Sequence, residues 1–116
     1  MLSEQDFEFI VAQMKKFAVK AMNCLKQTDK ILASENPNRV SAFGFLSQAG
    51  SLMRSAEVIY YSHYDDLMHN DIEHLFEQFD TFVWAALTST ENDYNTNAHS
   101  EYCKLKDDFS YCVLSQ

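Results

Sequence analysis

Potential metal ligands are concentrated in one short part of the sequence, residues 63–74. Imidazole nitrogens and carboxylate oxygens are common ligands of divalent metal ions. Asp66 and His69 have the carboxylate-x-x-histidine spacing of di-metal helical bundles, and His69 and Glu73 are one helical turn apart. The full set is His63, Asp65, Asp66, His69, Asp71, Glu73 and His74. One candidate is therefore a metal site built from Asp66, His69, Glu73 and Glu77.

The sequence around this cluster weakens the metal hypothesis. Di-metal bundles take their ligands from the inward faces of several helices. The apolar stripes of segments 4–34 and 98–114 contain neither glutamate nor histidine at their centres. The cluster also falls at a helix boundary, with Asn70 as the expected cap. We favour a polar turn followed by an acidic first helical turn, which the helix dipole stabilises. A metal-binding helical bundle remains the alternative.

Carboxylates of the next segment could also serve a hydrolase. Glu73, Glu77 and Asp80 could hold Mg²⁺, as in helical nucleotide pyrophosphohydrolases. Such enzymes carry paired acidic motifs on two helices, whereas segment 37–64 contains only Glu57. A metal-dependent hydrolase is therefore the alternative to a non-enzymatic protein without a cofactor, which we favour.

A cysteine nucleophile is the remaining catalytic possibility. The chain has three cysteines, Cys24, Cys103 and Cys112, without a CxxC spacing. Only Cys103 has a histidine close in sequence, His99, which precedes it by one helical turn. A thiol beside a histidine can act as a nucleophile, but no third group is evident, and we do not expect catalysis from this pair.

Charge is unevenly distributed along the chain. Residues 55–103 contain ten acidic residues and no lysine or arginine, whereas seven of the nine basic residues lie in the first 54 positions. The formal net charge is −8. Such asymmetry is typical of an interaction surface rather than of a particular fold.

Four residues of the expected helix 71–88 share one face. With about 100° between successive residues, Glu73, Glu77, Asp80 and Trp84 fall together beside the apolar stripe. Tryptophan is common at the hot spots of protein interfaces. We expect this face to bind a protein partner with a basic surface, with the carboxylates steering and Trp84 anchoring. The alternative is a solvated acidic face whose tryptophan folds onto the protein.

Apolar residues recur at helical spacing in four segments, 4–34, 37–64, 71–88 and 98–114. Capping residues precede three of them: Ser3, Asn36 before a proline, and Asn70. Two glycines and one proline are too few for the turns of an all-β domain. We therefore predict an all-α protein, a single-domain antiparallel four-helix bundle of 116 residues.

One flank of the expected helix 37–64 consists of small and polar residues. Glycine inside a helix costs roughly 0.5 to 1 kcal/mol relative to alanine, so Gly44 and Gly50 need a reason. We favour close packing of this helix inside the bundle, with a homodimer seam as the alternative. The flank is Ser41, Gly44, Gln48, Ser51 and Ser55.

The expected surroundings of the protein follow from the same features. The odd cysteine number and the absence of a signal-peptide pattern indicate a reduced, cytoplasmic protein. No apolar run is long enough to span a membrane. The acidity and the lack of a basic patch or phosphate-binding glycine loop argue against direct nucleic-acid binding.

The favoured function is a small acidic protein-protein interaction module. Its more specific form is an inhibitor or anti-defence protein that presents carboxylates where a basic groove would hold phosphates, and so mimics a nucleic acid. A structural homo-oligomer, including a homodimer, is a further alternative. In it the basic first helix of one copy meets the acidic third helix of another, through Lys15, Lys16, Lys20, Lys26 and Lys30.

Overall fold

The computed structural model describes residues 2–90 and 92–115. Within these ranges the secondary structure is helical and contains no β-strand, so the predicted all-α class is confirmed. Glu91, one of the carboxylates of the acidic span, lies outside the described residues. None of the described helices is both long and apolar enough to cross a bilayer. The elements are α1 (Glu4–Leu32), α2 (Arg39–Ser62), α3 (Tyr64–Leu67), α4 (Asn70–Thr88), α5 (Ala98–Tyr111) and the 3-10 helix η1 (Val113–Ser115).

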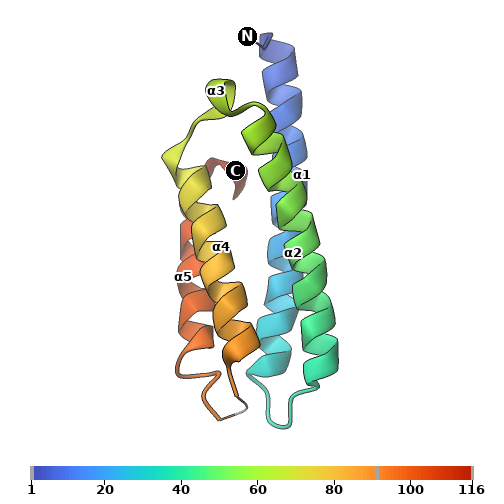
Figure 1. Ribbon diagram of the computed structural model, residues 1–116, viewed down its shortest axis with the longest axis vertical. Coiled ribbons are helices and arrows are strands. Elements are labelled where there is room, and N and C mark those ends of the chain that lie inside the picture. Colours follow the sequence, from blue (N-terminus) through green and yellow to red (C-terminus); the bar gives the residue numbers. More distant parts are fainter. Residues whose placement is uncertain (1, 91, 116) are drawn as a thin grey trace.

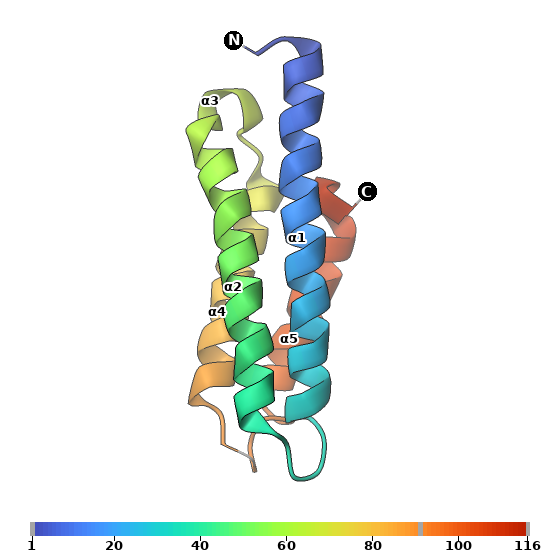
Figure 2. The same ribbon diagram turned by 90° about the vertical axis from the view of Figure 1, so that its right-hand side faces the viewer.

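Four long helices, α1, α2, α4 and α5, lie along the long axis of an elongated molecule (Figure 1). Its principal dimensions are 51 × 21 × 20 Å. α1 and α2 pack together as a hairpin, α4 packs mainly on α5, and η1 contacts α1. The first turns of α1 project beyond the other helices at one end (Figure 2), and the side chains of residues 3–9 are exposed.

The first two helix starts are set by capping side chains. Ser3 caps α1 as predicted, because its hydroxyl accepts a hydrogen bond from the backbone N–H of Asp6 at 3.1 Å. The predicted cap at Asn36 is wrong. Asn36 has a φ of 49°, the left-handed conformation that asparagine tolerates in turns. Asn38 caps α2 instead and accepts from the N–H of Ser41 at 3.1 Å.

Two further boundaries also differ from the prediction. α4 is capped by His69 rather than Asn70, because Nδ1 of His69 accepts a hydrogen bond from the N–H of Asp71 at 3.2 Å. The predicted helix 98–114 stops at Tyr111, and η1 follows it. The shift from Asn70 to His69 is one residue, a difference that is normal at helix ends.

The chain reversal between α2 and α4 is held by one buried hydroxyl. Tyr60 is fully buried, and its hydroxyl accepts from the N–H of His69 at 2.9 Å. The same hydroxyl donates to the carboxylate of Glu73 at 3.0 Å. Burial raises the pKa of Tyr60, with the carboxylate of Glu73 adding to the shift and the backbone bond to His69 opposing it. The phenol therefore stays neutral and keeps its proton for Glu73.

Small residues bring α1 and α2 close together, and aromatic residues of α4 fill the remaining core. Each fully buried aliphatic or aromatic side chain contributes about 1.5 to 3 kcal/mol through removal of apolar surface from water. The buried alanines of the hairpin are Ala18, Ala21, Ala42, Ala49 and Ala56, and the buried phenylalanines of α4 are Phe76, Phe79 and Phe82.

The glycines of α2 do not serve close packing, and that expectation is wrong. A Cβ atom placed on Gly44 or Gly50 would meet nothing within 4 Å. Four of the five residues of the small polar flank are exposed, and Ser55 is half-buried. The close approach predicted for glycine is made by alanine on the opposite side of α2.

Candidate functional site

The outer face of α4 carries the residues that the sequence singled out. Glu77, Asp80 and Trp84 are exposed there, and Trp84 retains 70% of its accessible surface. The alternative in which this tryptophan folds onto the protein therefore does not hold. Glu73 differs from the others, because it is half-buried and bonded to the hydroxyl of Tyr60.

α2 adds two residues to this face. Asp80 is close enough to Glu57, and the carboxylates of Glu57, Glu73 and Glu77 to Tyr61, for their charges to act on these two groups. Burial raises the pKa of Tyr61, and those carboxylates raise it further. We define the acidic face as Glu57, Tyr61, Glu73, Glu77, Asp80 and Trp84. The sequence signal for the two missed residues was a Glu and a Tyr one helical turn apart on α2.

The surroundings of Glu57 raise its pKa. Its side chain is 20% exposed, and Nε of Arg54 lies 3.4 Å from one carboxylate oxygen. Burial raises the pKa of Glu57, the charge of Asp80 raises it further, and Arg54 lowers it in part. The charge of Asp80 thus acts on Glu57, and the largely exposed Arg54 offsets it in part.

Glu57→Gln is expected to raise the free energy of unfolding by up to about 1 kcal/mol at neutral pH. A carboxyl whose pKa is raised by folding supports the folded state fully below its unfolded pKa and loses that support as the pH rises through the folded value. The gain from glutamine should therefore vanish in acid. Denaturant titrations at neutral and acidic pH measure it, and an equal gain at both pH values would contradict this explanation.

The lysines of α1 do not neutralise the acidic face. In the described part of the chain, Arg54 pairs with Glu57 and Lys104 with Glu101, and the rings of His74 and His99 contact the carboxylates of Asp108 and Asp29. None of them involves a lysine of α1. The packing explains this, since the main contacts of α1 are with α2, η1 and α5.

The candidate metal ligands are not assembled. Asp66 lies exposed in α3, His69 uses Nδ1 to cap α4, and Glu73 is bonded to Tyr60. Glu77 lies one turn further along α4. Across residues 2–90 and 92–115, no group of three or more His, Cys, Asp or Glu side chains is placed to hold a metal ion.

A second polar cluster lies where α1, the segment before α5, and α5 meet. The carboxylate of Asp29 is nearly buried and accepts a hydrogen bond from the hydroxyl of Tyr94 at 2.7 Å. Nδ1 of His99 lies 2.8 Å from the same oxygen. The thiol sulfur of Cys103 lies 3.7 Å from Nε2 of His99. Sequence reasoning found the Cys103–His99 pair but missed Asp29 and Tyr94.

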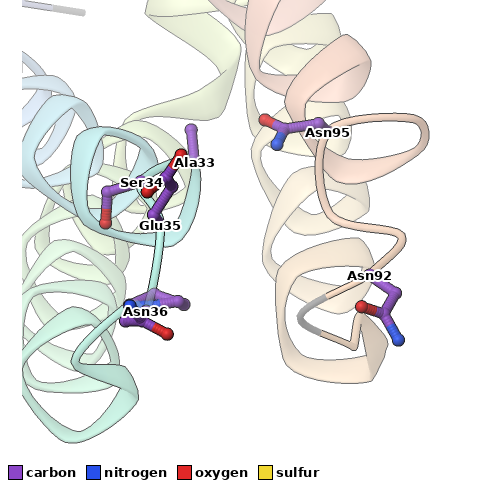
Figure 3. A pocket seen from close by; sticks show the side chains of 7 residues that line it. Ala33, Ser34, Glu35, Asn36, Asn92 and Asn95 are labelled. Atoms are coloured by element: carbon purple, nitrogen blue, oxygen red, sulfur yellow. The ribbon is translucent and has the colours of Figure 1, made fainter.

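A polar cleft opens beside the loop that joins α1 to α2. Its volume is about 440 Å³, and Figure 3 shows Ser34, Glu35 and Asn36 on one side with Asn92 and Asn95 on the other. Its lining residues are Ala33, Ser34, Glu35, Asn36, Pro37, Asn92 and Asn95. Glu35 is the one charged side chain among these seven residues, so they offer no acid–base pair.

Comparison of the chain with protein-family models, curated proteins and solved structures gave no match.

Proposed function

We propose that this protein is a non-enzymatic interaction module that docks its acidic face on a protein partner with a basic surface. The scaffold in this proposal is an antiparallel four-helix bundle of α1, α2, α4 and α5, with α2 and α4 presenting the face. The observation that carries the proposal is the exposure of Trp84, 70%, beside the exposed carboxylates of Glu77 and Asp80.

The two kinds of residue would contribute differently to docking. Separated surface charges mainly accelerate encounter and fix orientation, and Glu77 and Asp80 would do this. A large aromatic side chain that becomes buried at an interface mainly slows dissociation, and Trp84 would do that. A cation of the partner near Asp80 and Glu57 would also relieve the repulsion that raises the pKa of Glu57.

A more specific form of the proposal is an inhibitor or anti-defence protein that occupies a nucleic-acid-binding groove. Carboxylates one helical turn apart, about 5.4 Å along the axis, form a row on α4 with no α1 lysine paired to it among the described residues. Such a row of negative charge is attractive to a groove lined by lysine and arginine.

A homo-oligomer is a second candidate because the lysines of α1 are also available. Lys16, Lys20, Lys26 and Lys30 are exposed and do not pair with α4 within the described residues. A contact between this basic helix and the acidic face of another copy would weaken with salt. A molecular mass in solution that falls towards that of the monomer as salt rises would favour this candidate.

The proposed docking is tested with partners captured from a lysate of the source cell and then purified for kinetic measurement. Trp84→Ala is expected to raise the dissociation rate about tenfold or more, as for an interface hot spot. The double variant Glu77→Gln, Asp80→Asn is expected to lower the association rate and its salt dependence.

Matched controls remove the same chemistry elsewhere on the surface. Tyr111→Ala removes an aromatic side chain that is 82% exposed on α5. Glu4→Gln with Glu8→Gln removes two exposed carboxylates from the start of α1. If these controls change binding as much as the variants of the acidic face, or if neither set changes it, this face is not the docking site.

A further inference from the structure

We propose that Cys103 is an activated thiol that exchanges with small disulfides, with His99 as its base and Asp29 as the group that orients the base. This inference is independent of the docking function, because the three residues belong to α1 and α5 rather than to the acidic face. The arrangement places nucleophile, base and orienting carboxylate in one hydrogen-bonded line, the relationship by which thiol and hydroxyl nucleophiles are activated in proteins.

The hydrogen-bonding capacities of the groups fix the direction of proton transfer. An ionised carboxylate can only accept hydrogen bonds, so Nδ1 of His99, 2.8 Å from Oδ1 of Asp29, carries a proton. In the neutral imidazole, Nε2 is then the acceptor, and it lies 3.7 Å from the sulfur of Cys103. The thiol proton of Cys103 therefore has an acceptor already aligned by a second residue.

The orienting carboxylate is itself held in place. Asp29 is 8% exposed, and its Oδ1 also accepts a hydrogen bond from the buried hydroxyl of Tyr94 at 2.7 Å. Burial raises the pKa of Tyr94, and the carboxylate of Asp29 raises it further, so the phenol remains a donor. A carboxylate with two donors and little solvent access has one orientation, which it imposes on His99.

Cys103 differs from Cys112 in access and from the equally partly exposed Cys24 in the histidine nitrogen 3.7 Å from its sulfur. Cys103 is partly exposed, and the side chain of His99 is 41% exposed. Cys112 is fully buried, and burial raises its pKa. Burial likewise raises the pKa of Cys24. Both of these thiols are therefore kept protonated, and their structural surroundings disfavour reaction.

Disulfide exchange is the reaction that this site is equipped to perform. It needs a thiolate and an open line of approach to its sulfur, both of which a partly exposed Cys103 with an adjacent base provides.

The step balances without a further reactant. The thiol proton of Cys103 moves to Nε2 of His99, and the thiolate sulfur attacks one sulfur of the small disulfide. The sulfur–sulfur bond of that disulfide breaks as the bond to Cys103 forms. One thiolate leaves and takes up the proton held by Nε2 of His99, so that His99 is neutral again and the protein ends as a mixed disulfide at Cys103.

The rate of modification of each cysteine by 5,5′-dithiobis(2-nitrobenzoate), an anionic disulfide, tests the proposal. Each site is identified by mass spectrometry of peptides, at neutral pH, in the native protein and in the denatured chain. An ordinary cysteine carries only a few per cent of thiolate at neutral pH, and thiolates of lower basicity are intrinsically less nucleophilic. Cys103 is therefore expected to react about threefold to tenfold faster in the native protein than in the denatured chain.

The denatured chain separates activation from exposure. Exposure alone cannot make a thiol react faster than it does in the denatured chain. Cys24 and Cys112 should react more slowly in the native protein than in the denatured chain. His99→Gln should bring the native rate of Cys103 down to the denatured rate or below. Tyr94→Phe, which removes one of the two donors to Asp29, should lower the native rate of Cys103 less than His99→Gln does.

Either of two results would overturn the proposal. One is a native wild-type rate at Cys103 that does not exceed the denatured rate, which needs no variant at all. The other is an unchanged native rate in a folded His99→Gln protein, as judged by its circular dichroism spectrum.

Discussion

Tyr94→Ala should lower the free energy of unfolding by about 3 to 5 kcal/mol, the range for removal of a large buried aromatic side chain. Tyr94 is 1% exposed and comes from the segment between α4 and α5. Its ring fills space in the core, and its hydroxyl binds the carboxylate of Asp29. Alanine therefore leaves a cavity and removes one of two donors from a nearly buried charge.

The variant Tyr94→Phe separates the two contributions. It keeps the ring and removes only the hydrogen bond to a charged group, which costs about 1.5 to 3 kcal/mol. Urea denaturation followed by circular dichroism measures both variants. Equal losses for alanine and phenylalanine would show that the ring contributes little, and would contradict the cavity argument.

The wild type and the Tyr94→Phe variant should also differ in how their stability changes at alkaline pH. The pKa of Tyr94 is raised in the folded state, mainly by burial and then by Asp29. A group whose pKa rises on folding supports the folded state fully below its unfolded pKa, and that support is lost as the pH rises towards the folded value. Above the ordinary tyrosine value of 10.0, the wild type should therefore lose stability faster than Tyr94→Phe.

Phe82→Ala is the second substitution with a large expected effect, about 3 to 5 kcal/mol. Phe82 is completely buried on the inner side of α4, and its ring contacts Tyr102 of α5 with centroids 5.7 Å apart. Trp84, two residues later, points into solvent. Trp84→Ala should therefore change the free energy of unfolding by no more than about 0.5 kcal/mol.

The contrast between Phe82 and Trp84 bears directly on function. A tryptophan that can be removed without loss of stability is not retained for packing, and the docking experiment with Trp84→Ala then reports on binding alone. Denaturant titration of the two variants makes the comparison. A loss of several kcal/mol from Trp84→Ala would place this side chain in the core and weaken the proposed function.

Helix content and the faces of individual helices could be read from the sequence. The period of α4 separated the inward Phe79 and Phe82 from the outward Glu77 and Trp84, because burial follows the helical repeat. The Ser3 cap could be predicted because few other capping residues lie near the start of α1. At the turn after α1, Asn36 and Asn38 are both asparagines, so the residue type does not show which of them caps α2. The backbone conformation decides, because Asn36 is left-handed and Asn38 is extended.

The composition of the sites depended on contacts between helices, which a single sequence does not specify. Glu57 joins the acidic face because α2 and α4 pack with a particular rotation about their axes. Asp29 offered a usable signal, since it follows the buried Leu25 by one turn and precedes the buried Leu32 by another. A carboxylate in a core-facing register needs a buried partner, but Tyr94 lies in a polar segment without periodicity.

The α1–α2 hairpin has a consequence for how the chain folds. The two longest helices are neighbours in the sequence and form the most extensive contact in the described structure. Joining them closes only a short loop, 33–38, which costs little chain entropy. Contacts of η1 with α1 instead join residues from opposite ends of the sequence. We therefore expect the hairpin in the folding nucleus, and η1 to dock on α1 after the main barrier.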